Sequence, residues 1–292
     1  MAEMLTIPAI YYGQCKSLFE EIKNLDYAVV KGEPLSLFAY GELGKRRSSD
    51  IDILISRGDI IALEKALLKN SFQTPNTDRT ERILILSGSH QTKSWSKDIS
   101  PLGFVCIDVN FDVFWGEYTG VRFDMKEFLS DVIEINVYGC IIKTLTPIKQ
   151  FTQLVLHHYK EMNSIYHLSS HNSINLKMFN DVYQLYKNSR EITIESVCEI
   201  AQKYKIVPYV FYVLYYTNQV FLDDEISKIL ELLETDEGNA LLDCYGLSSL
   251  ERKKWKVDFL TRLNSDDMFD LIKNDLDSKD IEKLERNMRM FR

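Results

Sequence analysis

Two aspartates, Asp50 and Asp52, stand two residues apart in the run DIDILIS at 50–56. In a β-strand, side chains at i and i+2 project from one face, so both carboxylates point the same way and the isoleucines between them fill the other face. Two neighbouring carboxylates repel each other unless a cation lies between them, and Mg²⁺ prefers such oxygen ligands. The pair therefore predicts either an ordinary solvated strand end or a Mg²⁺ site.

A later strand-like run, FVCIDVNFDVFW at 104–115, offers further acids. It places Asp108, Asn110 and Asp112 at alternate positions, so these three side chains share one face. If this run is a neighbouring strand, one of its acids can supply a third metal-binding carboxylate. We expect Asp108 in that role and leave Asp112 open as the alternative.

The segment before the aspartate pair has the character of a phosphate-binding turn. A short apolar strand at 27–30 runs into Lys31 and Gly32, and a helix follows. Glycine permits close backbone approach, and a helix N-terminus offers free N–H groups and positive potential to a phosphate. The polar loop GKRRSS at 44–49 adds three cations.

Short strands and helices alternate through the first half of the chain. We expect strands at 27–30, 50–56, 81–87, 104–115 and 138–145, with helices between the first of them, which is an α+β pattern. From Pro147 onward the apolar residues recur with helical spacing. The sequence thus predicts a mixed β-sheet domain with flanking helices over 1–145, followed by an all-α domain over 146–292.

Composition limits the classes of protein to which this chain can belong. It has 292 residues and a formal net charge of −8, which argues against a basic protein that coats nucleic acid. The 45% hydrophobic content excludes disorder, and no apolar run is long enough to span a membrane. Five scattered cysteines give no disulfide framework, and the N-terminus lacks a secretory signal. We therefore expect a soluble, cytoplasmic protein.

The stretch VVKGEPLSLFAYGELGKRRSSDIDILI at 29–55 resembles the polymerase-β-like nucleotidyltransferase superfamily. It is most similar to the branch of stand-alone bacterial enzymes, which carries L-K-G and then R-x-x-x-D-I-D. The segment from Asp108 to Phe111 is similar to the family's D-L-H-W, with Asn110 in place of the histidine. The helix beginning at Pro147, with His157 or His158, is similar to the start of the family's helical half.

This resemblance implies an enzyme that moves an NMP group from an NTP, with ATP expected, to an acceptor hydroxyl or phosphate. It implies two Mg²⁺ ions, with Mn²⁺ as an alternative. Asp50, Asp52 and Asp108 would act as metal ligands and catalytic residues. The nucleotide phosphates would be bound by Lys31, Gly32, Arg46, Arg47 and Ser49. The helical domain would bind the acceptor, which could be an antibiotic, a natural-product or peptide intermediate, or RNA. Net acidity favours a small molecule or peptide.

Three alternatives stay open. The chain could be a nucleotide-binding regulatory or assembly subunit that has lost catalysis, or a metal hydrolase if His157, His167 and His171 converge. The basic run at 252–256 could bind an RNA acceptor, although a solvated helix face is the simpler interpretation. The sequence does not indicate the oligomeric state, the roles of His157 and His158, or the role of residues 190–292.

Overall fold

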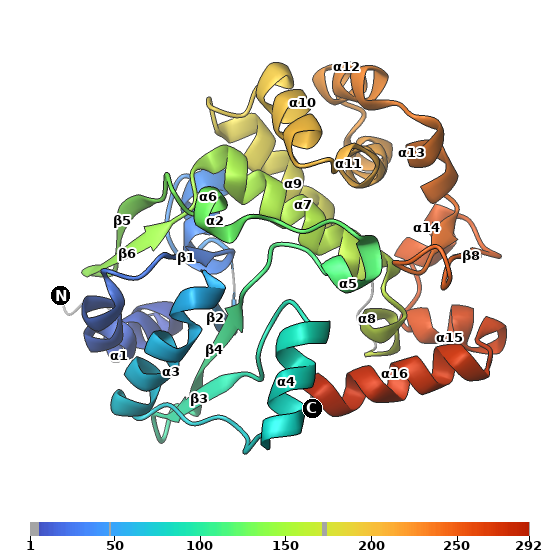
Figure 1. Ribbon diagram of the computed structural model, residues 1–292. Helices are drawn as coiled ribbons and strands as arrows, with labels where there is room; N and C mark the ends of the chain where they lie inside the picture. The colour runs from blue at the N-terminus through green and yellow to red at the C-terminus, as the bar shows by residue number, and fades with distance from the viewer. Residues whose placement is uncertain (1–5, 47, 171–173, 292) are drawn as a thin grey trace. The chain divides into compact units, whose positions relative to one another are not determined.

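The computed structural model describes residues 6–46, 48–170 and 174–291. The chain divides into two compact units, the first comprising Met1–Val113 and Arg122–Gln150 and the second Phe114–Val121 and Phe151–Arg292. The first unit contains a mixed sheet and the second is mainly helical, so the predicted α+β class is confirmed (Figure 1). The predicted domain boundary at 145/146 lies close to the last crossing between the units, at 150/151. The sequence did not indicate that 114–121 joins the second unit.

Six strands form the sheet of the first unit in the order β3-β4-β2-β1-β6-β5. Their bounds are β1 (Tyr27–Val30), β2 (Asp50–Ile55), β3 (Trp95–Asp98), β4 (Phe104–Asn110), β5 (Ile133–Val137) and β6 (Cys140–Thr144). The pairs β2/β4 and β1/β6 are parallel, and the other three pairs are antiparallel. This makes a mixed sheet with β2 and β1 at its centre and β4 between β2 and the edge strand β3.

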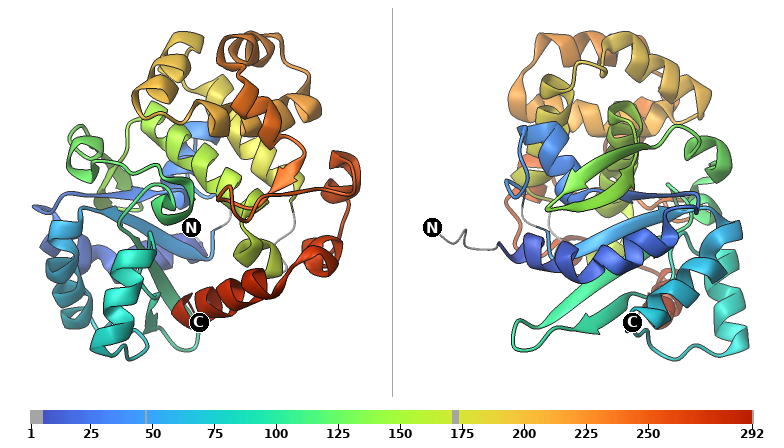
Figure 2. Two further views of the ribbon diagram at one scale, coloured as in Figure 1. Left: turned by 45° about the vertical axis from the view of Figure 1, so that its right-hand side comes forward. Right: turned by 90° about the vertical axis from the view of Figure 1, so that its left-hand side faces the viewer.

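One face of this sheet is apolar and is covered by α1 (Ile7–Ile22) and α3 (Ile60–Lys69) (Figure 1 and Figure 2). The isoleucines of β2, Ile51, Ile53 and Ile55, are buried in this core. Alternate residues of β4 join them, so strict alternation leaves the polar residues of both strands on the opposite face. The core thus fixes the direction in which the aspartates project.

The expected strand at 81–87 is wrong, because this segment belongs to helix α4 (Arg79–Gly88). Asp78 caps the helix by accepting a hydrogen bond from the backbone N–H of Glu81. In the run ILIL at 83–86, Ile85 is buried, whereas Ile83 and Leu84 are more than half exposed. That one-sided burial is helical, and a buried strand would not show it. The expected strand at 104–115 ends at Asn110.

The remaining helical segments of the first unit are α2 (Gly32–Tyr40), η1 (Arg57–Asp59) and α6 (Met125–Phe128). Helix α7 (Pro147–Asn163) begins in the first unit and continues into the second. The second unit also contains α5 (Gly116–Thr119), α8 (Ile165–Ser169), α9 (Leu176–Asn188), α10 (Ile194–Lys203), α11 (Val207–Phe221), α12 (Asp224–Leu233), α13 (Asp236–Leu241), α14 (Phe259–Leu263), α15 (Met268–Ile272), η2 (Lys273–Asp275) and α16 (Ser278–Phe291). A short hairpin, β7 (Cys244–Tyr245) and β8 (Lys253–Lys254), interrupts them.

Helix α11 forms the centre of the second unit and packs against α9, α10, α12 and α13. Its residues Tyr212, Val213 and Leu214 are fully buried. The aromatic rings of Tyr159 on α7 and Tyr212 meet edge to face with centroids 5.1 Å apart. None of the described helices combines the length and apolar character that crossing a membrane requires.

Candidate active site

The parallel pairing of β2 and β4 brings two of the predicted acids to adjacent positions. Its register pairs Asp52 with Asp108 and Asp50 with Cys106. Since the isoleucines of β2 and the alternate residues of β4 fill the core, all three carboxylates lie on the other face of the sheet. Two strands that are separated by more than 40 residues of sequence thus place Asp50, Asp52 and Asp108 on one small patch.

Asp52 lies at the centre of this patch and is only 5% exposed. Its Oδ1 is 2.8 Å from Nζ of Lys31, and Asn110 Nδ2 donates a longer hydrogen bond of 3.5 Å to the same oxygen. Burial raises the pKa of Asp52 to about 6; Lys31 opposes this shift, whereas the charges of Asp50 and Asp108 add to it. Because burial and neighbouring negative charges both disfavour this carboxylate, a bound cation would stabilise it.

The other two carboxylates each have a serine partner. Ser48 Oγ donates a 3.0 Å hydrogen bond to Asp50 Oδ1, and Ser94 Oγ donates a short one to Asp108 Oδ1. The three carboxylates do not form a group whose ligand oxygens all lie within 4.8 Å of one another. Their residue types and shared face fit Mg²⁺, which often takes one or two protein carboxylates together with substrate phosphates.

Asp112 occupies a different environment from Asp108. Because β4 ends at Asn110, Asp112 lies beyond the strand and is not paired with β2. Its side chain is buried near the guanidinium of Arg57. Burial lowers the pKa of Arg57, and the charge of Asp112 opposes that change. In the described structure Asp108, and not Asp112, therefore stands in register with Asp52.

The turn at Lys31 and Gly32 connects β1 to α2 with an unusual backbone. Lys31 has φ of 56° and ψ of −142°, and Gly32 has φ of 39°. A positive φ is unfavourable for lysine, and such strain is typical of functional sites. The ammonium of Lys31 is mostly shielded and points to Asp52, so the turn brings a cation directly to the buried acid.

The predicted phosphate-binding loop is held to α2 by two side chains that the sequence analysis did not single out. The buried carboxylate of Glu33 accepts hydrogen bonds from the N–H of Gly44, at 2.8 Å, and from the hydroxyl of Tyr138, at 3.1 Å. Ser36 Oγ accepts a 3.1 Å bond from the N–H of Arg46. Burial raises the pKa of Glu33, although its hydrogen-bond partners and Arg46 oppose the shift.

The structure thus describes most of the predicted phosphate-binding residues. Gly32 is buried at the turn, the backbone of Arg46 is fixed by Ser36, and Ser49 is exposed. Arg47 lies outside the described residues. Glu33 was visible in the sequence as an acid in the first turn of a helix, a favourable position. Ser94 gave no signal, because the segment before β4 was expected to be a loop.

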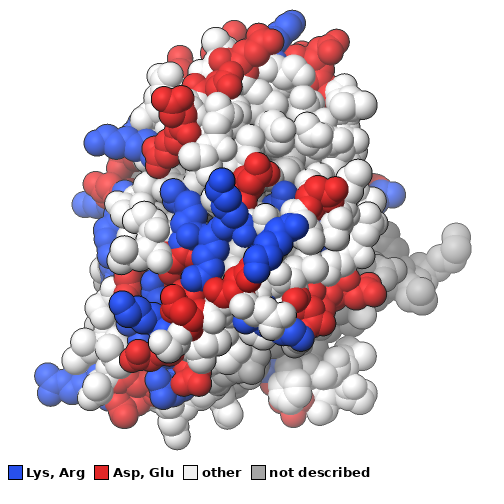
Figure 3. Space-filling view, turned by 90° about the vertical axis from the view of Figure 1, so that its right-hand side faces the viewer, with Lys and Arg blue, Asp and Glu red and all other residues white. Residues whose placement is uncertain are grey.

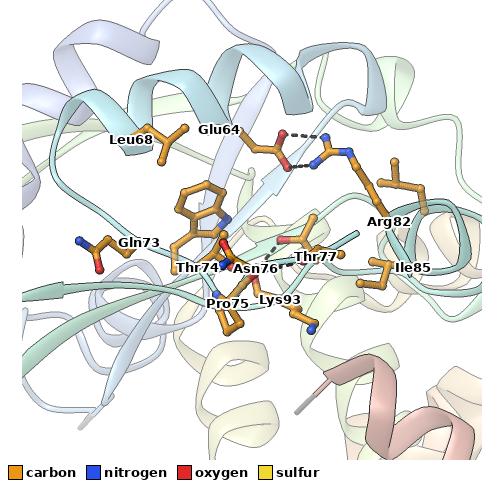
Figure 4. A pocket seen from close by; sticks show the side chains of 13 residues that line it. Glu64, Leu68, Gln73, Thr74, Pro75, Asn76, Thr77, Arg82, Ile85 and Lys93 are labelled. Atoms are coloured by element: carbon orange, nitrogen blue, oxygen red, sulfur yellow. Dashed lines mark hydrogen bonds and ion pairs between the residues drawn. The ribbon is translucent and has the colours of Figure 1, made fainter. Parts of the chain in front are cut away.

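A cavity of about 450 Å³ lies in the first unit between α3, α4 and the approach to β3 (Figure 4). Glu64 and Arg82 face each other across it and form a two-pronged ion pair, with N–O distances of 3.0 and 2.7 Å. None of the predicted site residues lines this cavity. Its walls include Lys93 and Trp95, and Trp95 belongs to the apolar core on the face of the sheet opposite to the aspartates.

The histidine predictions lead to a different grouping in the second unit. His171 lies outside the described residues, so the predicted convergence of His157, His167 and His171 is not described. His167 packs edge-on against Trp115, with centroids 6.2 Å apart. Among the described residues, the one group of three close metal-binding side chains is His157, His158 and Glu161.

Basic side chains on the second unit are interleaved with acids. The run at 252–256, expected to be a helix face, contains strand β8, and Lys253 Nζ lies 2.7 Å from Asp280. On α16, Lys283 pairs with Glu251 at 2.8 Å. In Figure 3, the Lys and Arg side chains gathered on this side of the molecule are bordered by Asp and Glu. Basic and acidic side chains thus share this face, and four of the basic ones, Lys279, Lys283, Arg286 and Arg289, lie together on α16.

A protein-family model described as "Uncharacterised nucleotidyltransferase" matches residues 9–222. The chain therefore belongs to this family of nucleotidyltransferases, which confirms the resemblance read from residues 29–55. Among solved structures, it is similar to an antigenic nucleotidyltransferase-like protein from Paracoccidioides brasiliensis. That match has 17% identity, covers 70% of this chain and 89% of the other, and has a TM-score of 0.35. The search of curated proteins found no match.

Proposed function

We propose that the chain is a metal-dependent nucleotidyltransferase that moves an NMP group from an NTP, with ATP expected, to a hydroxyl or phosphate acceptor. The observation that carries this proposal is the register of β2 and β4, which sets Asp108 beside the buried Asp52 with Lys31 at 2.8 Å. Membership of the nucleotidyltransferase family supports the same reaction class. We expect the enzyme to act in the cytoplasm.

The reaction is an in-line displacement at the α-phosphorus. An acceptor oxygen forms the new P–O bond, the bond to the β-phosphate oxygen breaks, and pyrophosphate leaves with the electron pair. The partly exposed carboxylate of Asp108, oriented by Ser94, would receive the acceptor's proton. Asp50, Asp52 and Asp108 would hold Mg²⁺ or Mn²⁺, and two such ions neutralise charge on the attacking and leaving oxygens.

Lys31 has a second role in this scheme. Its ammonium balances Asp52 in the described structure, and an incoming triphosphate offers it another anionic partner. Gly32 begins helix α2, so free backbone N–H groups lie beside that cation. Arg46, with Arg47 and Ser49, would complete the phosphate contacts. Glu33 and Ser36 would fix the loop that carries these three residues.

The acceptor is proposed to be a small molecule or a peptide, and the interleaved charges of the second unit support this choice over RNA. Incubation with each α-³²P-labelled NTP, Mg²⁺ and a cell extract should label an acceptor, and fractionation should identify its class. Asp52→Asn and Asp108→Asn should abolish labelling. Asp98→Asn, at an exposed acid on β3, is the matched control.

The outcomes separate the enzyme from the regulatory alternative. Labelling that survives in Asp52→Asn would refute the proposed site. A wild-type protein that binds an NTP with Mg²⁺ but labels no acceptor from any extract would support a nucleotide-binding regulatory subunit. Labelling that disappears after ribonuclease treatment would make RNA the acceptor.

A further inference from the structure

Two histidines and a glutamate, His157, His158 and Glu161, meet on helix α7 in the second unit. None of them is among the residues that the sequence analysis assigned to metal or nucleotide binding in the first unit. Successive residues of an α-helix are rotated by about 100°. Glu161, four residues after His157 and three after His158, therefore lies between the two histidines in the helical projection. The spacing H-H-x-x-E lets one carboxylate face both imidazole rings.

The contacts among the three side chains show this convergence. His157 Nε2 lies 3.1 Å from Glu161 Oε1, and His158 Nδ1 lies 3.3 Å from Oε2. With one ligand atom taken from each residue, the three atoms all lie within 4.8 Å of one another. Atoms bound tetrahedrally at the usual zinc–nitrogen distance of about 2.0–2.1 Å are about 3.3–3.4 Å apart. Each imidazole nitrogen already has nearly this spacing from one oxygen of Glu161, His157 from Oε1 and His158 from Oε2.

The three side chains are shielded to different degrees. The His158 side chain is 5% exposed, whereas those of His157 and Glu161 are 17% and 25% exposed. His158 Nε2 is buried without a hydrogen-bond partner in the described structure, so Nδ1 is the nitrogen it presents to the group. The site has a buried wall and an accessible side, through which an ion can enter.

We propose that His157, His158 and Glu161 bind one zinc-class divalent ion. Two imidazoles and a carboxylate form a His₂Glu set, and such a three-ligand set leaves a fourth position for water or a substrate group. Imidazole nitrogen suits Zn²⁺, Co²⁺ and Ni²⁺, whereas Mg²⁺ prefers oxygen. This site therefore selects a different metal from the aspartates of the first unit, and it does not depend on the proposed transfer reaction.

The test measures zinc directly on the full chain. The protein is stripped with EDTA, dialysed against Zn²⁺ with excess Mg²⁺, and analysed by inductively coupled plasma mass spectrometry. Wild type should retain one Zn²⁺ per chain. His157→Gln and Glu161→Gln should each weaken zinc binding at least tenfold, whereas His167→Gln, at a histidine outside the group, should not. Substitution with Co²⁺ should give the visible absorption of a tetrahedral site in the wild type and in His167→Gln, but not in His157→Gln or Glu161→Gln.

Circular dichroism and melting curves establish whether each variant is folded before its zinc content is interpreted. Wild-type protein that retains no zinc would overturn the proposal. Equal zinc loss in His167→Gln would also overturn it. Because the readout is metal content, failure here leaves the NTP labelling experiment unaffected.

Discussion

The two units concentrate their reactive side chains in different ways. In the first unit, carboxylates from β2 and β4 meet because two strands distant in sequence pair in parallel with Asp52 opposite Asp108. In the second unit, His157, His158 and Glu161 meet because they share one turn of α7. The first set is assembled by tertiary structure and the second by the helical repeat.

Ligand chemistry separates the two sets as well. The first offers only oxygen, with Lys31 as a resident cation at Asp52. The second offers two ring nitrogens and one carboxylate. Oxygen sets with phosphate suit Mg²⁺, and imidazole sets suit zinc-class ions. If both proposed metal sites form, residue type alone would direct Mg²⁺ to the first unit and a zinc-class ion to the second.

The largest effect is expected for Asp52→Asn. Loss of this carboxylate should lower turnover by about a hundred- to a thousandfold or more, since electrostatic contacts at the reacting phosphate contribute on this scale. Its melting temperature should hold or rise, because the change removes a charge that burial, Asp50 and Asp108 disfavour, which offsets the lost ion pair with Lys31. Zinc content should stay as in wild type. If Asp52→Asn also loses zinc, the two sites are not separate.

Lys31→Ala should have the next largest effect. Loss of a charge-assisted contact typically costs about 1.5–3 kcal/mol, so NTP affinity with Mg²⁺ should fall about ten- to a hundredfold. A nucleoside without phosphates should bind nearly as before. Isothermal titration with a non-hydrolysable NTP measures both, and Lys65→Ala, at an exposed lysine of α3, controls for net charge. Equal affinities in wild type and Lys31→Ala would assign phosphate binding to Arg46 or Arg47.

Ser94→Ala tests how Asp108 is oriented. The hydroxyl of Ser94 donates to Asp108, and a hydrogen bond to a charged group contributes about 1.5 kcal/mol or more. Turnover should therefore fall about tenfold, with NTP affinity little changed. Ser87→Ala, at an exposed serine of α4, is the control. Unchanged turnover in Ser94→Ala would show that Asp108 needs no such partner.

The smallest effect is expected for Glu33→Gln and concerns pH. Burial raises the pKa of Glu33, so the folded chain binds this proton more tightly than the unfolded chain. The protonated carboxyl contributes its whole stabilisation at pH values below the pKa of the unfolded chain, about 4.3. This contribution to the free energy of unfolding is lost as the pH rises through the higher pKa of the folded chain. Glutamine does not titrate. The unfolding free energy of the variant minus that of wild type should therefore increase from about pH 4 to 7, as measured by urea denaturation.

A flat difference across that range would show that Glu33 keeps an ordinary pKa. The variant keeps an oxygen that can accept the hydrogen bonds from Gly44 and Tyr138, so the loop at 41–46 should stay in place. Mutation of Ser36 to alanine removes the other anchor of the same loop and does not introduce a titrating group. Its stability should depend on pH as in wild type.

Much of the first unit was predictable because its signals are local. The alternation in 50–56 fixed the strand and the face of Asp50 and Asp52, and the core of Ile51, Ile53 and Ile55 confirms it. Where two local signals compete, prediction failed: the apolar run ILIL at 83–86 favoured a strand, but the cap at Asp78 and one-sided burial gave helix α4. Glu161 was overlooked, although its spacing from His157 and His158 is visible in the sequence.

The sequence by itself determined which residues could do chemistry, because side-chain type and the periods of strand and helix are local properties. It also indicated the nucleotidyltransferase family, through the pattern at 29–55. Only the tertiary structure decided that β4 lies parallel to β2 with Asp108 opposite Asp52, and that Ser94 reaches Asp108. Strand register depends on contacts between distant segments and on the burial of a shared face, which no local pattern specifies.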